Sequence, residues 1–221
     1  SLYKNNDFES SKSYHVMGYY NDFYGAYWHE DNFGSVHYAR SDEKLGMKIF
    51  LWSQAQDGKI WEDLLTDTDG QYVELQSGKM YNQPATKSAF TPFKHKSFAP
   101  QGFDEWTEYW YPVKETRGIS KASTIGAINW QRNGGKLTVY FSPVQKGTTT
   151  LRLYNGTKEI KSDTLQMEIL KTWVGEFDVP VDATLKLVIG DDELVYSEAL
   201  QDYEISRPRE LPKDFDWNSV Y

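Results

Sequence analysis

The chain contains no cysteine, which excludes disulfides, thiolate metal sites and a cysteine nucleophile together. It has no apolar run near the ~18–20 residues that cross a bilayer as a helix, so membrane insertion is not expected. Acidic residues outnumber basic ones, 32 to 24, and no cluster of lysine and arginine offers a site for phosphates, so we expect no nucleic-acid partner. The compartment is left open, with an extracytoplasmic location only slightly favoured.

Histidine is also scarce, with four residues in the chain and no His-x-x-x-His pair. His29 and His37 are eight positions apart across a glycine-containing segment, which is not a zinc-ligand spacing. We therefore expect no metal and no other cofactor. His29 keeps some interest as a candidate catalytic residue, because it follows Trp28 and precedes an acidic pair, but a surface histidine is the simpler alternative.

The chain does contain short segments in which apolar and polar residues alternate, with turn residues between the segments. After Gly134-Gly135 the pattern predicts a small immunoglobulin-like β-sandwich over residues 134–200. Its expected strands lie at residues 137–141, 149–154, 158–161, 172–177, 184–189 and 193–196. Residues 201–221 carry two prolines and several charges and are predicted to be a linker, after which a helix is expected.

The first part, residues 1–133, has a different composition, since it holds all four histidines and six of the eight tryptophans. This change places a predicted domain boundary at Gly134-Gly135. Strands are expected at residues 36–39, 48–52, 72–75 and 126–130, joined by long loops rich in aromatic and polar residues. The fold class predicted for the whole chain is therefore all-β.

The aromatic residues of the first part suggest a carbohydrate partner. Sugar rings stack their C–H faces on flat side chains, while their hydroxyls need carboxylates, amides or histidine nearby. The candidate stacking residues are Trp28, Trp61, Trp106 and Trp110. For any single tryptophan, packing in a core is the simpler explanation; only the group favours a sugar.

Acidic residues accompany these tryptophans, in Trp61-Glu62-Asp63 and in Asp67-Thr68-Asp69-Gly70. Two carboxylates on either side of a glycosidic bond can act as acid and base, or as acid and nucleophile. Asp63 and Asp69 are therefore candidate catalytic residues and Glu62 a candidate substrate ligand. The alternative for Asp69 is a plain turn in which aspartate side chains bond to the local backbone.

The segment from Ile60 to Gln83 carries a more specific resemblance. Its Trp-Glu-Asp and Thr-Asp-Gly-Gln-Tyr strings are followed by a Glu-x-Gln-x-Gly stretch, then by Phe90-Thr-Pro-Phe93 and Trp110-Tyr-Pro-Val113. The chain thereby resembles a bacterial family of unassigned function that places a galactose-mutarotase-like β region ahead of tetratricopeptide repeats. The resemblance covers residues 15–133 most strongly, and implies that these form the C-terminal part of a larger supersandwich in an excised fragment.

The resemblance also implies a leading residue. Aldose epimerases of this fold carry a catalytic glutamate at a strand end, followed two positions later by glutamine, and Glu74 and Gln76 match that pattern. Glu74 would then take a proton from a sugar hydroxyl, with Gln76 as a substrate ligand.

Three functions follow as hypotheses. The first is an enzyme acting on carbohydrate, either glycoside hydrolase-like or aldose-epimerase-like. The second is a glycan-binding module without catalysis. The third is a scaffold that meets a protein partner through downstream repeats.

Overall fold

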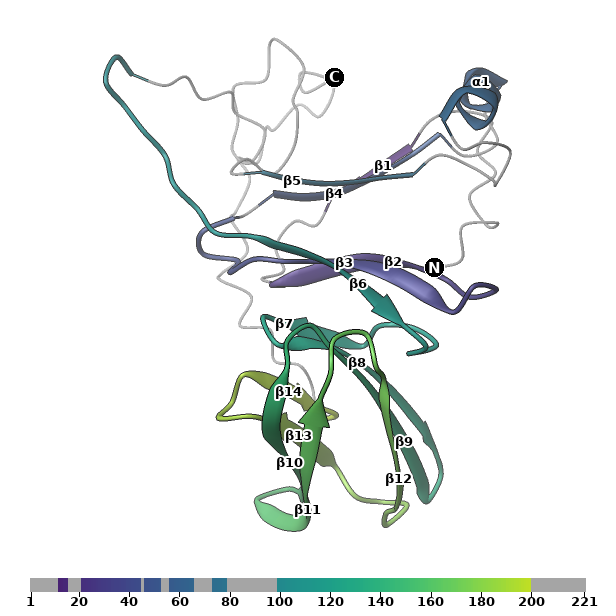
Figure 1. Ribbon diagram of the computed structural model, residues 1–221, viewed down its shortest axis with the longest axis vertical. Helices are drawn as coiled ribbons and strands as arrows, with labels where there is room; N and C mark the ends of the chain where they lie inside the picture. The colour runs from purple at the N-terminus through teal and green to yellow at the C-terminus, as the bar shows by residue number, and fades with distance from the viewer. Residues whose placement is uncertain are drawn as a thin grey trace, which may run out of the picture. The chain divides into compact units, whose positions relative to one another are not determined.

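A computed structural model describes residues 12–15, 21–44, 46–52, 56–65, 73–78 and 99–199. Strands make up 58% of the residues and helix 5%, so the all-β prediction is confirmed. The chain divides into two compact units, each described here by itself (Figure 1). Unit 1 comprises residues 1–20, 41–106 and 204–221, and unit 2 comprises residues 21–40 and 107–203.

Unit 1 contains a three-stranded antiparallel sheet with the strand order β1-β4-β5. Its strands are β1 (Lys12–His15), β4 (Gly46–Leu51) and β5 (Val73–Gly78). Helix α1 (Gln56–Leu65) lies between β4 and β5 in the sequence. No such helix was expected, because its polar residues hide the periodic apolar pattern. No helix within the described ranges is long and apolar enough to cross a membrane.

Unit 2 contains a β-sandwich of two four-stranded antiparallel sheets (Figure 1). One sheet consists of β11 (Lys158–Met167), β10 (Gly147–Asn155), β13 (Leu185–Ile189) and β14 (Leu194–Ser197), in that order. The other consists of β12 (Trp173–Asp178), β9 (Lys136–Pro143), β8 (Gly126–Asn133) and β7 (Lys121–Ser123), in that order.

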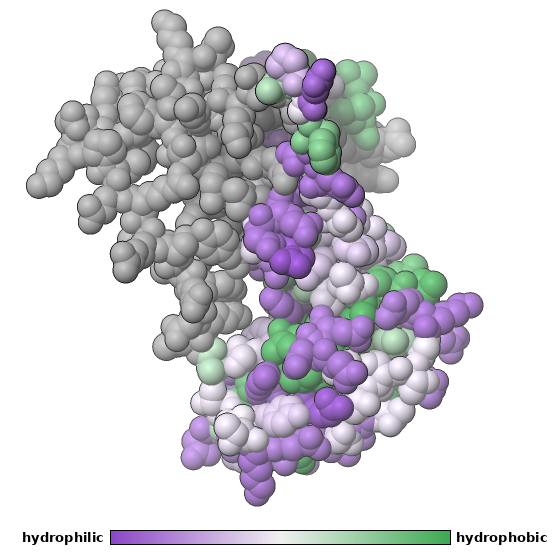
Figure 2. Space-filling model, turned by 90° about the vertical axis from the view of Figure 1, so that its left-hand side faces the viewer, coloured by the Kyte–Doolittle hydropathy of each residue, from purple (hydrophilic) through white to green (hydrophobic). Residues whose placement is uncertain are grey.

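The sandwich forms because each strand alternates apolar and polar residues, so that one face of each sheet is apolar. Leu151 and Leu153 of β10 are fully buried between the sheets, and Phe141 of β9 faces them in the same core. On the face that Figure 2 shows, the coloured residues are mainly hydrophilic or neutral, with smaller hydrophobic patches between them.

Gly134-Gly135, where the sequence analysis places a domain boundary, is the turn of the β8–β9 hairpin. Gly134 has a φ of 57°, a left-handed conformation that glycine adopts without strain. The strands of the sandwich therefore begin ahead of that turn, at β7. The change in composition falls at a turn within the sandwich because β8 carries Trp130, the last tryptophan of the first part.

A further three-stranded sheet of unit 2 has the order β2-β3-β6. Its strands are β2 (Phe23–Trp28), β3 (Phe33–Tyr38) and β6 (Tyr109–Lys114). It packs on β7 and β8 through a small core that includes Val36, Val113 and Ala127. The Tyr111 hydroxyl donates to the Ser123 carbonyl at 2.7 Å, with the Gly126 carbonyl at 3.0 Å, and burial raises the pKa of Tyr111.

Arg132 fastens one end of the sandwich. Its guanidinium donates to the carbonyl oxygens of Pro180 at 2.7 Å, Val181 at 3.0 Å and Ala183 at 2.8 Å, and it forms an ion pair with Glu198. The Glu198 carboxylate also accepts from the Trp130 indole and the Leu185 amide. The fork of donors on one arginine thus holds the loop after β12 against β8.

Candidate functional site

Glu74 and Gln76 lie on the same face of β5, because alternate residues of a strand point to the same side. The Gln76 amide nitrogen donates to the Glu74 carboxylate. The register places Glu74 opposite Phe50 and Gln76 opposite Lys48 on β4. Since directly opposed residues of an antiparallel pair share a face, the four side chains form one surface.

This surface remains half-buried, whereas the other face of β4 is covered. Met47 and Leu51 point to the covered face and are 4% and 6% exposed. Lys48, Phe50, Glu74 and Gln76 are all of intermediate exposure. The sheet thus packs through one side and leaves the side with Glu74 partly open to solvent.

Lys48 gives this surface a cation whose charge is disfavoured by its surroundings. Burial lowers the pKa of Lys48, while the negative charge of Glu74 acts in the opposite direction. The Lys48 ammonium also lies 5.2 Å from the centre of the Phe50 ring. The surface therefore offers an ammonium, a carboxylate and an amide within two neighbouring strands.

Three aromatic rings extend the same face beyond the end of β4. The Phe50 ring centre lies 5.1 Å from that of Trp52 in an edge-on arrangement. The Trp52 ring centre lies 5.9 Å from that of Trp61 on α1. We call Lys48, Phe50, Trp52, Trp61, Glu74 and Gln76 together the polar–aromatic face.

Helix α1 reaches Trp52 because it carries a glycine at the point of contact. A Cβ added to Gly58 would lie 2.9 Å from the Trp52 Cβ and 3.0 Å from the Trp52 carbonyl oxygen. A larger residue would therefore push the helix away from Trp52. Gly58 is what allows Trp61 to lie beside Trp52.

Three of the predicted site residues are thus found in the polar–aromatic face: Glu74, Gln76 and Trp61. The sequence analysis did not single out Lys48, Phe50 and Trp52 as site residues. Their alternation within one expected strand was a usable signal, since it places all three on the same face.

Three other predicted residues belong to unit 2, and two of them lie on strands of a different sheet from Glu74. Trp28 ends β2, is 48% exposed and lies 6.3 Å from Phe33 between ring centres. His29 is exposed in the following turn, 5.2 Å from the Tyr27 ring. Trp110, on β6, is 48% exposed with its ring centre 4.6 Å from that of His37.

Trp110 adjoins a polar pair, a buried histidine and a partly exposed glutamate, that the sequence analysis did not predict. His37 is 1% exposed, and its Nε2 lies 2.8 Å from the Glu108 carboxylate. The pair joins β3 to the residue just before β6. Because the two residues are 71 positions apart, no short sequence motif predicts their contact.

The remaining predicted residues are Trp106, Glu62, Asp63 and Asp69. Trp106 belongs to unit 1, and the Lys44 ammonium lies over its ring, 4.8 Å from the ring centre. Glu62 and Asp63 occupy positions on α1, but their side chains lie outside what the structure describes, and Asp69 lies outside the described residues altogether. In the parts of the chain that are described, no three histidine, aspartate or glutamate side chains gather as a metal site.

Chemically, the polar–aromatic face combines flat apolar surface with hydroxyl-binding groups. The aromatic rings can cover one face of a sugar ring, while the carboxylate accepts from hydroxyls and the ammonium donates to them. The Gln76 amide already orients one side of the Glu74 carboxylate, which limits the side-chain rotamers that a ligand would have to fix.

Comparison with protein families matches residues 1–113 to a family described as a domain of unknown function, DUF5107. The match includes the polar–aromatic face and ends within β6, ahead of the sandwich. No solved structure matches the chain.

Proposed function

The chain belongs to the DUF5107 family of domains of unknown function, and from that premise we propose that its polar–aromatic face binds a carbohydrate. The observation that carries the proposal is the continuity of two sets of side chains on one sheet face. The aromatic row of Phe50 and Trp52 adjoins the polar pair of Glu74 and Gln76 through direct cross-strand pairing. Flat rings beside hydroxyl-binding groups are what a sugar requires.

In the catalytic form of this proposal, Glu74 exchanges a proton with a sugar hydroxyl. Its carboxylate accepts a hydrogen bond from Gln76 and has a nearby cation in Lys48, an arrangement that would hold the base in one orientation. A glycoside hydrolase-like or aldose-epimerase-like activity would then reside at Glu74. Without catalysis, the same residues would only hold the sugar, and the chain would be a glycan-binding module.

We also propose the finer architecture that the sequence resemblance implies. Residues 1–133 would be a galactose-mutarotase-like region, and the sandwich an immunoglobulin-like module ahead of helical repeats. The all-β fold supports this architecture at the level of fold class, and the family match agrees with a family of unassigned function. In the scaffold alternative, the repeats would meet a protein partner.

Binding is tested with a glycan array probed by the 221-residue chain, followed by titration of the best ligand. Trp52→Ala should weaken binding about tenfold or more, because it removes the central ring of the aromatic row. Trp28→Ala is the matched control, since Trp28 is an exposed tryptophan of unit 2. Absence of any glycan ligand, or a larger loss from the Trp28 variant, would refute the site.

Catalysis is tested on the same ligand by following release of reducing sugar and interconversion of anomers by NMR. Glu74→Gln should abolish turnover but spare most of the binding, because the amide keeps the shape and loses the base. Glu30→Gln is the control, an equal change at an exposed position of the β2–β3 turn. If wild-type protein binds sugar without turnover, the binding-module form stands and the catalytic form fails.

A further inference from the structure

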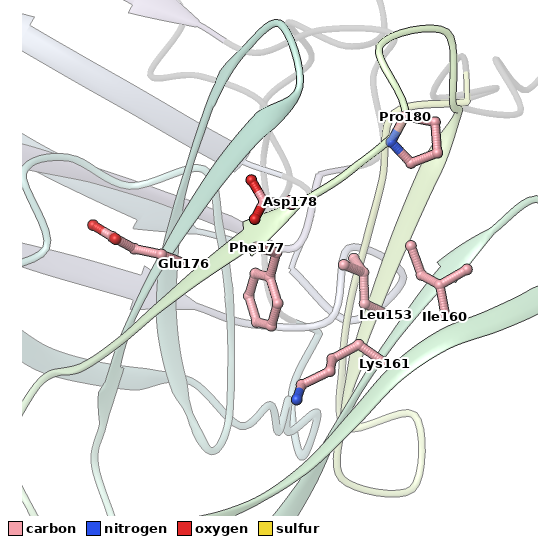
Figure 3. A pocket seen from close by; sticks show the side chains of 7 residues that line it. All are labelled: Leu153, Ile160, Lys161, Glu176, Phe177, Asp178 and Pro180. Carbon is pink, nitrogen blue, oxygen red and sulfur yellow. The ribbon is translucent and has the colours of Figure 1, made fainter.

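The sandwich of unit 2 has a pocket of about 320 Å³ on the side where β11 and β12, from opposite sheets, form its edges. Leu153, Ile160, Phe177 and Pro180 supply its apolar lining, and Lys161, Glu176 and Asp178 are its charged lining residues. Figure 3 shows these side chains, which come from β10, β11, β12 and the loop after β12. On the opposite side of the sandwich, the edge strands β7 and β14 contact each other.

Two sheet edges flank this pocket. β12 pairs only with β9, and β11 only with β10, among the strands that the structure describes. An edge strand presents backbone donors and acceptors that another chain can pair with, and proteins usually protect such edges with lysines, prolines or bulges.

β11 carries these protections. Its register with β10 shifts so that Leu153 pairs with Lys161 and Tyr154 with Glu159, leaving Ile160 as the extra residue of a bulge. The edge also contains Lys158 and Lys161. The bulged Ile160 is among the side chains that line the pocket.

β12 has none of these protections. Its sequence Trp-Val-Gly-Glu-Phe-Asp contains no lysine or proline, and its six residues pair with β9 without a register shift. Glu176 is exposed on the outer face of the strand and makes no ion pair with a residue in the described ranges. β12 is therefore an open, acidic edge beside an apolar pocket.

We propose that β12 is a docking edge for an extended segment of a partner protein in which apolar and basic residues alternate. The added strand would pair with the β12 backbone, as in strand addition to an exposed sheet edge. Its inward side chains would lie beside Phe177, which lines the pocket, and its outward side chains would lie beside Glu176. Alternation places these two kinds of residue next to each other in the partner sequence.

Charge favours such a partner over a second copy of this chain. If two β12 strands paired antiparallel, they would bring both copies of Glu176 and Asp178 to the same face of the joined sheet. Lys136 pairs with Asp178, and its charge also interacts with that of Glu176, so that one cation is shared between two carboxylates. A basic segment supplies the missing charge, whereas a second copy adds like charges.

The pocket is also held in place before any partner arrives. Pro180, which lines it, lies in the loop whose carbonyl oxygens accept from Arg132. The neighbouring Val179 amide donates to the Gly135 carbonyl at 2.9 Å. A lining fixed by internal hydrogen bonds reduces the ordering that binding would require.

The test is an NMR titration of the 15N-labelled 221-residue chain with a capped hexapeptide of alternating lysine and valine. Saturable shifts should centre on the amides of β12 and on Ile160. A peptide with glutamate in place of lysine should not bind. A peptide of the same composition with its lysines and valines in two separate blocks should bind much more weakly, because it cannot alternate faces.

Two pairs of variants locate the contact. Glu176→Lys should raise the dissociation constant about fivefold or more, while Asp191→Lys, an equal charge change in the exposed β13–β14 turn, should change it less than twofold. Ile160→Trp should block the pocket, while Ile169→Trp, at a similarly exposed isoleucine that does not line it, should not.

Three results would overturn the proposal. The first is no saturable shift at β12 with the alternating peptide. The second is equal loss of affinity in both members of either variant pair, which would indicate a nonspecific charge or hydrophobic effect. The third is a concentration-dependent shift of β12 in the protein alone, which would make a second copy the occupant.

Discussion

The sandwich buries Leu151 and Leu153 completely, whereas every residue of β5 in the sheet of unit 1 remains of intermediate exposure. Both regions are antiparallel sheets with alternating side chains. They differ in what covers the second face. The sandwich covers it with another sheet, while the face of β4 and β5 that carries Lys48 and Glu74 is left half-open.

The two regions therefore differ in role: the sandwich core contributes stability, and the polar–aromatic face carries the groups that could contact a ligand. In the sandwich, apolar contacts fill the space between the sheets, and such cores contribute most of a domain's stability. On the polar–aromatic face, charged and aromatic groups are only partly withdrawn from water, which keeps them available to a ligand. We therefore expect core substitutions to unfold unit 2 and face substitutions to alter binding.

The largest expected effect comes from truncating one leucine side chain in each of the two regions. Leu153→Ala should cost about 2–5 kcal/mol, because Leu153 is fully buried and its removal leaves a cavity. Leu75→Ala, at a half-buried leucine of β5, should cost about 1–2 kcal/mol. Native-state hydrogen exchange of amides in β10 and β4 measures the two regions separately. Equal costs would show that the two sheets are stabilised alike.

A smaller effect is expected at the polar clamp of the sandwich. Arg132→Lys should cost about 1–3 kcal/mol, because one ammonium cannot reproduce the guanidinium contacts to three carbonyl oxygens and Glu198. Exchange of the Ala183 amide, which donates to the Pro180 carbonyl, should accelerate most. Lys136→Arg, at an exposed ion pair, serves as the control and should change little. A loss of hydrogen-exchange protection confined to the amides of β7 would contradict this role of Arg132.

The smallest expected effect concerns the pKa of Lys48 on the polar–aromatic face. NMR titration of the Lys48 side chain should give a pKa below the ordinary 10.5, and Glu74→Gln should lower the pKa further by removing an opposing charge. Between the lowered pKa and 10.5 the unfolded chain holds more protons, so the stability of this sheet should rise with pH there. A Lys48 pKa at or above 10.5 would mean that burial does not outweigh the attraction of Glu74.

The sequence was informative wherever local alternation decides the outcome. The alternating residues around Leu151 and Leu153 predicted the strand that buries them, and the two-residue spacing of Glu74 and Gln76 placed both on one face. Resemblance to a family, rather than pattern alone, drew attention to Glu74.

Contacts between distant segments lay beyond that reasoning. Lys48 meets Gln76 only because β4 and β5 pair in one particular register, and Trp61 reaches Trp52 only because Gly58 permits it. Counting tryptophans also could not assign Trp28 and Trp110 to a different sheet from Glu74, since sheet membership depends on long-range pairing.

The pairing of β3 with β6 has a consequence for the order of folding. Tyr38 ends β3 and stands opposite Tyr109 at the start of β6, so joining them closes a loop of roughly 70 residues at an entropic cost. β6 has a nearer contact, the hydrogen bond from Tyr111 to Ser123. We expect β6 to pack on β7 and β8 first. The β2–β3 hairpin would form separately and pair with β6 afterwards, which completes the sheet.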